Sequence, residues 1–353
     1  MATSTYYTGI DLHKRTAYLT TVDENGTVAG QKKLSCQREA LREYFGSFEE
    51  EAQHEAAVET TIGWYWVADL LEEEGVDLKL AHAKYLKAIS YAKVKTDKVD
   101  SETLAQLLRA DMIPEAHQIS RDLRDKRDTL RTRLTLVERR SSALQSIQTL
   151  LQKLNVEAVG DLPVLYQAQA RCHQEQVELL TEQIRELEKS LHPHLVPNDQ
   201  IQRLLWIPGV GKTVAFTIYL EIGTVERFPS EKQFFSYCRL VPGASDSGGK
   251  KSHSHRKDGN RYLKLAFSHA GVRAVQYYPV VRSFYERKLQ KKPEAIARAI
   301  VAKEIARICY HVLRKREDFN GRFKGTPMSR QKKPNWPRLP RSNEPRREAS
   351  PSV

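Results

Sequence analysis

The chain has 353 residues and a formal net charge of +13, with 57 lysines and arginines against 44 acidic residues. This length predicts more than one domain. The basic excess indicates a polyanionic partner such as nucleic acid; the alternative is a basic protein that has no such partner. The four cysteines form no CxxC pair, so we expect neither a zinc site nor disulfides. No apolar run approaches the roughly 18 residues of a membrane span, and no signal pattern begins the chain. We therefore expect a soluble, cytoplasmic protein without a membrane partner.

Residues 5–115 alternate predicted strands and helices. Apolar runs predict strands at 6–10, 16–22, 28–34, 56–59 and 77–81. Asp23-Glu24-Asn25-Gly26 predicts a hairpin turn between the second strand and the third. Amphipathic patterns predict helices at 38–48, 64–74 and 97–110. This order of elements is that of an RNase H-like α/β domain, which we expect over residues 1–115.

Four carboxylates of this domain occupy positions that suit a metal-dependent nuclease. Asp11 and Glu59 each end an apolar run, and Asp97 and Asp100 lie three residues apart where a helix is predicted to begin. In the RNase H-like fold the acidic residues come from the first strand, the fourth strand and a late helix. Carboxylate oxygens hold the hard divalent cations that assist reactions at phosphodiesters. The sequence therefore predicts one metal site formed by these four residues.

Residues 121–155 form one long predicted helix, and a second helix follows the break at 160–163 and runs to about residue 191. Their apolar residues recur at a broken spacing of three and four. We expect a helical linker over residues 116–198, arranged as an antiparallel hairpin, as an oligomerisation stalk, or as a spacer packed on its own chain. Several arginines make its first half basic, as a solvated face or as one that faces phosphate.

A mainly helical domain is expected over residues 199–320. It opens on Ile207-Pro208-Gly209-Val210-Gly211-Lys212-Thr213, which lacks the GxxxxGK spacing of a nucleotide-binding phosphate loop. The segment instead predicts a helix-hairpin-helix-like turn between helices at 200–206 and 213–222. One interpretation is that its glycines let backbone N–H groups approach a DNA phosphate at a helix N-terminus, next to Lys212. The alternative is that the glycines serve packing alone. Residues 321–353 contain six prolines and few apolar residues, and predict a disordered basic tail.

The densest polar stretch of that domain is residues 242–261. Ser245 and Ser247 precede a pair of glycines, whose flexible backbone permits close approach to a ligand. Four nearby basic residues are candidates for contacts to a scissile phosphate: Lys250, Lys251, Arg256 and Arg261. A serine becomes a good nucleophile only when a base or a metal activates it, here His253, His255 or a metal held by the carboxylates. Composition alone favours a solvated surface loop.

Several motifs carry a resemblance to a known family. In the N-terminal half they are Gly9-Ile10-Asp11-Leu12-His13-Lys14, Val58-Glu59-Thr60-Thr61 with Gly63, and Lys95-Thr96-Asp97-Lys98-Val99-Asp100. In the C-terminal half they are Ile207-Pro208-Gly209-Val210-Gly211, Leu240-Val241-Pro242 leading to Ser247-Gly248-Gly249-Lys250, and Gly259-Asn260-Arg261-Tyr262-Leu263. In this order they resemble the DEDD transposases of the insertion-sequence-110 family, which includes the Piv-type DNA invertases. The likeness covers residues 5–320.

The resemblance implies a RuvC-like N-terminal domain, a coiled-coil linker and a C-terminal transposase domain. Its Mg-binding residues would be Asp11, Glu59, Asp97 and Asp100. A serine, Ser247 with Ser245 as the fallback, would attack DNA and form a covalent intermediate. The resemblance also implies double-stranded donor and target DNA, recognised through a structured noncoding guide RNA. It further implies a homo-oligomer, dimer or tetramer, in which the carboxylates of one subunit act with the serine of another.

Two positions depart from the family pattern. Ser101 stands where an alanine commonly follows the last aspartate, and Asp246 places a negative charge before Ser247. Neither departure removes a catalytic group. Two other functions agree with the residues. One is a RuvC-like junction endonuclease that hydrolyses DNA with metal-activated water and does not need Ser247. The other is a nonenzymatic nucleic-acid-binding protein whose carboxylates form salt bridges.

Overall fold

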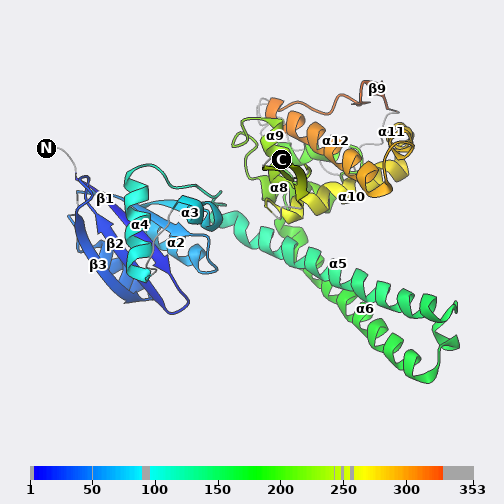
Figure 1. Cartoon of the computed structure of the whole chain (residues 1–353), viewed down its shortest axis with the longest axis horizontal. Coiled ribbons are helices and arrows are strands. Elements are labelled where there is room, and N and C mark those ends of the chain that lie inside the picture. The colour runs from blue at the N-terminus through cyan, green and yellow to red at the C-terminus, as the bar shows by residue number, and fades with distance from the viewer. Residues whose placement is uncertain are drawn as a thin grey trace, which may run out of the picture. The chain divides into compact units, whose positions relative to one another are not determined.

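The structure, a computed structural model, describes residues 4–49, 51–89, 96–241, 243–247, 250–254 and 258–328, and between 243 and 254 it describes the backbone only. The chain divides into two compact units, Met1–Asp122 and Leu123–Val353 (Figure 1). The first unit is mixed α/β and the second is mostly helical, as the sequence predicts. Over these residues no helix is both long enough and apolar enough to cross a membrane.

A five-stranded sheet forms the centre of the first unit, in the order β3-β2-β1-β4-β5. Its strands are β1 (Thr5–Leu12), β2 (Thr16–Val22), β3 (Val28–Ser35), β4 (Gln53–Glu59) and β5 (Asp77–Ala81). The first three pair antiparallel, while β4 is parallel to β1 and β5 is parallel to β4. The five predicted strands are confirmed, and the predicted turn closes the β2–β3 hairpin with Gly26 at a φ of 81°.

Four helices accompany the sheet: α1 (Arg38–Phe45), α2 (Trp64–Glu73), α3 (Ala83–Ile89) and α4 (Asp97–Arg109). The predicted helices are confirmed, although α1 ends earlier than expected. Helix α3 was not predicted, because a seven-residue helix that directly follows a strand carries too few turns to show a clear period.

Helix α4 packs unusually close to the middle of the sheet, and Gly9 of β1 makes this possible. A Cβ atom added at Gly9 would lie 2.0 Å from the carbonyl oxygen of Ser101 and 2.6 Å from the amide nitrogen of Ala105. Ser101 is fully buried, and its hydroxyl is bonded to the Thr20 hydroxyl of β2 at 2.7 Å. The serine that departs from the family pattern therefore ties α4 to the sheet.

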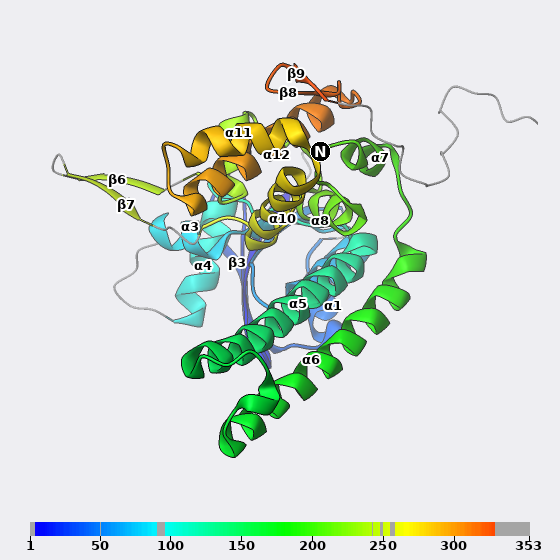
Figure 2. The same ribbon diagram turned by 90° about the vertical axis from the view of Figure 1, so that its right-hand side faces the viewer.

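The second unit begins with two long helices, α5 (Arg121–Leu154) and α6 (Val164–Leu191), which Figures 1 and 2 show side by side. Arg133 pairs with Glu188 at 2.7 Å, and Arg140 donates to the Thr181 hydroxyl at 3.4 Å. Advancing along α5 thus means retreating along α6, so the two helices are antiparallel. A short 3-10 helix, Val159–Asp161, lies in their connection.

The remaining helices form the mainly helical domain that the sequence predicts. They are α7 (Asp199–Leu205), α8 (Lys212–Ile222), α9 (Glu231–Tyr237), α10 (Arg261–Tyr277), α11 (Pro279–Leu289) and α12 (Glu294–Lys315), with a 3-10 helix at His192–His194. Their core includes the fully buried rings of Phe234 and Phe267. Helices α7 and α8 confirm the two helices predicted around the glycine turn.

Two short hairpins complete the second unit, and the sequence analysis predicted neither. Strands β6 (Gly243–Ser247) and β7 (Lys250–Ser254) form the first, and β8 (Arg322–Phe323) and β9 (Thr326–Pro327) form the second. The second lies at the start of the expected disordered tail and is ordered because Phe323, 1% exposed, packs against Phe284. Residues 329–353 of that tail lie outside the described residues.

Replacing Gly9 by alanine tests the packing of α4 on the sheet. We expect Gly9→Ala to lower the free energy of unfolding by about 1–3 kcal/mol, because the added methyl group would push the backbone of α4 away from β1. Urea unfolding measures the change. Gly160→Ala is the control, since an added Cβ there has nothing within 4 Å. Equal stability of Gly9→Ala and wild type would contradict the close packing.

Candidate active site

Asp11 and Glu59 lie at the same edge of the sheet. Strands β1 and β4 run parallel, with Ile10 opposite Val58, so the next residues along each strand are Asp11 and Glu59. In both strands the acidic residue directly follows three buried residues: Asp11 is the second-last residue of β1, and Glu59 is the last residue of β4. The carboxyl ends of parallel strands are where open α/β sheets commonly bind ligands.

Helix α4 brings two further carboxylates to this edge. Its first turn contains Asp97 and Asp100, and the Thr96 hydroxyl caps the helix by accepting a hydrogen bond from the Val99 amide. The cap fixes where the helix begins, and acidic residues are favoured in a first turn by the helix dipole. The close approach at Gly9 then holds this turn against the sheet.

His13 links Asp11 to Asp97. Its Nε2 is 3.2 Å from Oδ2 of Asp11 and 3.4 Å from Oδ1 of Asp97. Lys33 of β3 places its Nζ 3.7 Å from the other oxygen of Asp97. Ligand atoms of Asp11, His13 and Asp97 all lie within 4.8 Å of one another, a group compact enough for a metal ion.

The structure thus brings part of the predicted metal site together. Asp11 and Asp97 belong to the compact group, while Asp100 is close enough to act electrostatically on Asp11. Glu59 is placed at the same edge by strand register but does not belong to that group. His13 lies in the Gly9–Lys14 motif, and the sequence alone predicted no role for it. Its signal was the spacing Asp11-x-His13, which puts both side chains on one face of an extended chain.

The surroundings of Asp11 disfavour its charge. Burial raises the pKa of the Asp11 carboxyl above its usual value, His13 lowers it, and the negative charges of Asp97 and Asp100 raise it. The net effect is a raised pKa, so this site holds negative charge at some expense to the fold. A divalent cation would relieve both the burial and the repulsion, and carboxylate oxygens suit such an ion.

The second predicted site is a β-hairpin rather than an irregular loop. Ser247 ends β6 opposite Lys250, and Ser245 pairs with Ser252 further down. Figure 2 shows the hairpin extending from the helices of the second unit. The two glycines after Ser247, and Arg256, lie outside the described residues. Sequence reasoning missed the hairpin because its strands are short and polar, with no alternating apolar face.

Two glycines of the turn before α8 differ in what surrounds them. Gly209 has a φ of 77°, and an added Cβ would lie 2.0 Å from the Ala270 carbonyl oxygen of α10. Gly211 has nothing within 4 Å of an added Cβ and precedes the exposed Lys212 at the start of α8. Packing therefore accounts for Gly209, whereas no packing requires glycine at position 211.

Arg261, another predicted phosphate contact, has partners within the chain. Its guanidinium donates to Oε2 of Glu138 at 2.7 Å and lies over the Tyr262 ring, 5.6 Å from the centroid. The Glu138 carboxylate comes from α5, so Arg261 joins the start of α10 to the long helix. Any contact of Arg261 with phosphate would have to compete with this exposed ion pair.

Comparison with known proteins defines the class. A transposase model of the IS110 DEDD type matches residues 8–156, which contain the four carboxylates. The model of the Transposase IS116/IS110/IS902 family matches residues 201–286, which contain the glycine turn and the serine hairpin. The two matches together cover more than half of the chain. The fold and the acidic site thus belong to a transposase, a class of enzyme that acts on DNA.

Curated relatives agree over most of the sequence. The transposase for insertion sequence element IS1328 of Yersinia enterocolitica is 24% identical over 328 residues, which are 86% of this chain and 95% of the relative. A probable family 20 transposase of Pseudomonas aeruginosa is 24% identical over 332 residues, 86% of this chain and 96% of the relative. The chain belongs to the IS110 family of transposases.

Asp11→Asn tests the electrostatics of the acidic edge. Because the folded-state pKa of Asp11 is raised, its ionisation destabilises the metal-free fold at neutral pH, and this effect fades as the pH falls towards the ordinary value of 3.8. We expect Asp11→Asn to raise the Tm of metal-free protein at neutral pH, with a smaller gain at lower pH. The exposed Asp77→Asn is the control and should leave Tm unchanged.

The same variant should respond differently to metal. At a Mg²⁺ concentration about 100 times its Kd, wild type should gain about 2.7 kcal/mol in stability, and Asp11→Asn should gain much less. Thermal unfolding with and without Mg²⁺ measures both values. Equal stabilisation of the two proteins by Mg²⁺ would show that Asp11 is not a ligand.

Proposed function

We propose that this transposase cuts and rejoins donor and target DNA with Mg²⁺ at the acidic edge and Ser247 as the nucleophile. The observation that carries the proposal is the compact group of Asp11, His13 and Asp97 beside Asp100, at the end of strands β1 and β4. Glu59 would complete the ligand set from β4. The donors fit the ion, since Mg²⁺ prefers carboxylate oxygens and the site has an excess of negative charge.

The arrangement of the first unit supports an RNase H-like, RuvC-like domain. Three antiparallel strands are followed by two parallel ones in the order β3-β2-β1-β4-β5, and the acidic residues come from β1, β4 and α4. These are the elements from which that fold presents its metal ligands. The IS110 DEDD match over residues 8–156 contains all four carboxylates.

Ser247 would act in the reaction as an attacking alcohol. Its hydroxyl oxygen forms a bond to the scissile phosphorus, its proton passes to a base, and the bond from phosphorus to the leaving deoxyribose oxygen breaks. DNA is then held as a serine phosphodiester until another DNA hydroxyl reverses the step and restores Ser247. Bound Mg²⁺ would supply charge neutralisation at the phosphate and help to activate the attacking oxygen.

Sequence choice would be delegated to a structured noncoding RNA that pairs with donor and target DNA. The protein would then hold mainly the nucleic-acid backbone, as in other RNA-guided systems. The formal charge of +13 suits such binding. Lys250, Lys251 and Arg256 of the hairpin segment, together with Gly211 and Lys212, would contact phosphate.

A dimer or tetramer would allow the acidic site of one subunit and the serine of another to act on the same DNA. The carboxylates belong to the first unit and Ser247 belongs to the second, so each unit carries half of the proposed chemistry. The carboxylates of one subunit would act with the serine of another. The α5–α6 pair would serve as the coiled-coil linker of this assembly.

Covalent trapping tests the proposal. Full-length protein, the candidate RNA, DNA carrying the element junction and Mg²⁺ are incubated and then separated on a denaturing gel. We expect a protein–DNA adduct in wild type and in Ser245→Ala, and none in Ser247→Ala or Asp11→Ala. Cleavage without an adduct, unaffected by Ser247→Ala, would instead identify a hydrolytic junction endonuclease. Metal-independent DNA binding without cleavage would identify a nonenzymatic DNA-binding protein.

Gly211→Ala tests the proposed backbone contact at the start of α8. An added methyl group has open space in the free protein, and alanine is a poorer N-cap than glycine, so the free energy of unfolding should fall by no more than about 1 kcal/mol. A phosphate held by the local N–H groups would meet that methyl group, and DNA affinity should fall several-fold. Fluorescence anisotropy at fixed salt measures affinity, with Gly160→Ala as the control. Unchanged affinity would assign Gly211 no role in DNA binding.

A further inference from the structure

The second unit contains a buried carboxylate, Glu221 of α8, that contributes nothing to the apolar packing of its helix. Glu221 of α8 is 3% exposed, in a helix whose other buried residues are Ala215, Phe216, Thr217, Ile218, Leu220 and Ile222. Removing a carboxylate from water is unfavourable, and well-packed apolar residues at such sites are often equally stable or more so. Folding of α8 therefore gives no reason for an acid at this position.

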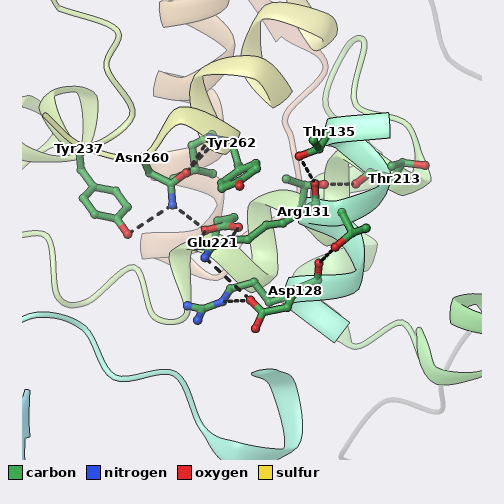
Figure 3. A network of polar contacts seen from close by, with 12 residues as sticks. Asp128, Arg131, Thr135, Thr213, Glu221, Tyr237, Asn260 and Tyr262 are labelled. Carbon is green, nitrogen blue, oxygen red and sulfur yellow. Dashed lines mark hydrogen bonds and ion pairs between the residues drawn. The ribbon is translucent and has the colours of Figure 1, made fainter. Parts of the chain in front are cut away.

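Each oxygen of Glu221 is held by a named donor. Arg131 of α5 donates from Nε to Oε1 at 2.6 Å and from Nη2 to Oε2 at 2.7 Å. Asn260 donates from Nδ2 to Oε2 at 2.6 Å (Figure 3). This bidentate pair fixes the orientation of the carboxylate, and the carboxylate in turn fixes the amide of Asn260.

The side-chain oxygen of Asn260 caps the N-terminus of α10. Its Oδ1 accepts hydrogen bonds from the amides of Tyr262 at 2.9 Å and Leu263 at 3.0 Å, which makes it the N-cap of that helix. Its own backbone N–H donates to the carbonyl of Tyr237 at 2.6 Å. The residue is thus bonded in three directions, to α8, to α9 and to α10.

The segment that carries Ser247 begins and ends beside Asn260. Its two ends, Arg239 and Gly259, are called the root of the β6–β7 hairpin below. Arg239, before β6, donates from Nε to the carbonyl of Gly259, after β7, at 2.8 Å. Gly259 has a φ of 91°, and an added Cβ would lie 2.5 Å from the Tyr237 carbonyl oxygen. The two ends of the segment are therefore closed against each other, next to Asn260.

Helix α5 reaches this root through more than one contact. The Arg131 guanidinium lies over the Tyr262 ring at 4.8 Å, and Glu138, two turns along α5, pairs with Arg261 at 2.7 Å. A chain of contacts thus runs from the long α5 helix through Glu221 to Asn260. Figure 3 shows α5, α8 and the start of α10 meeting at this carboxylate.

We propose that Glu221 and Asn260 are positioning residues: with Arg131 they fix the root of the β6–β7 hairpin relative to α5, and so set where Ser247 is presented. The consequence for the reaction rests on the proposed function of Ser247, but the effect on the hairpin does not. In this account Asn260 has two separable roles, since its oxygen caps α10 while its nitrogen makes the link to Glu221.

A polarity swap separates the two roles. Asn260→Asp keeps an oxygen for capping, because aspartate is as good an N-cap as asparagine, but sets a second carboxylate against Glu221 and breaks the link. Glu221→Gln added to Asn260→Asp restores the link in reverse: the new amide nitrogen, in place of Oε2, can donate to the new carboxylate. The amide oxygen, in place of Oε1, still accepts from Nε of Arg131, and only the bond from Nη2 to Oε2 is lost. The double variant also keeps the net charge that wild type has around Arg131.

Hydrogen exchange and trapping are measured on the same full-length proteins. We expect Asn260→Asp to speed exchange over residues 243–254, and the double variant to return it to the wild-type rate. Adduct formation should slow on the order of 100-fold in Asn260→Asp, as for a misplaced reacting group, and recover in the double variant. The rates of adduct formation are compared at saturating DNA, because the hairpin also carries Lys250 and Lys251 and its loosening can lower DNA affinity.

Each result decides a separate claim. Wild-type exchange over 243–254 in Asn260→Asp would overturn the link, whether or not wild type forms an adduct. Faster exchange with an unchanged rate of adduct formation would overturn the positioning role in the reaction. Failure of wild type to form any adduct would instead contradict the serine mechanism, and the exchange data would still decide the structural link.

Discussion

The close packing of α4 on strand β1 is the constraint on which the acidic edge depends. Gly9 lets the backbone of α4 approach so nearly that any side chain would collide with Ser101 and Ala105. With the helix at this depth, its capped first turn brings Asp97 to the end of β1, where His13 and Asp11 meet it. The proposed metal ligands are therefore brought together by one backbone contact, although their negative charges repel one another.

The second unit uses the same device around its own functional segment. Gly209 lets the turn before α8 rest on α10, and Gly259 lets the root of the serine hairpin rest on Tyr237. Glu221 of α8 is held by Arg131 and by Asn260, the residue that follows Gly259. Backbone contacts thus set the position of each segment, and one buried polar network sets its orientation.

Much of this architecture could be predicted from local sequence patterns. Apolar runs that end in Asp11 and Glu59, and an acidic pair at the start of a helix, are visible in the sequence from residue type and spacing alone. Helix α3 and the β6–β7 hairpin escaped prediction because short or polar elements show no clear period. The Arg131–Glu221–Asn260 network escaped because its members lie 90 and 39 residues apart in the chain, and only the packed helices reveal that they meet. His13 needed the fold to show its second neighbour, Asp97.

The most direct test of the central claim is a crystal structure of the full-length protein soaked in Mn²⁺, with anomalous data to locate the ion. The account predicts an anomalous peak at the acidic edge within bonding distance of Asp11 and Asp97, with Glu59 or Asp100 completing the oxygen ligands. Well-ordered density with His13 still bridging Asp11 and Asp97, and no peak there at saturating Mn²⁺, would contradict it.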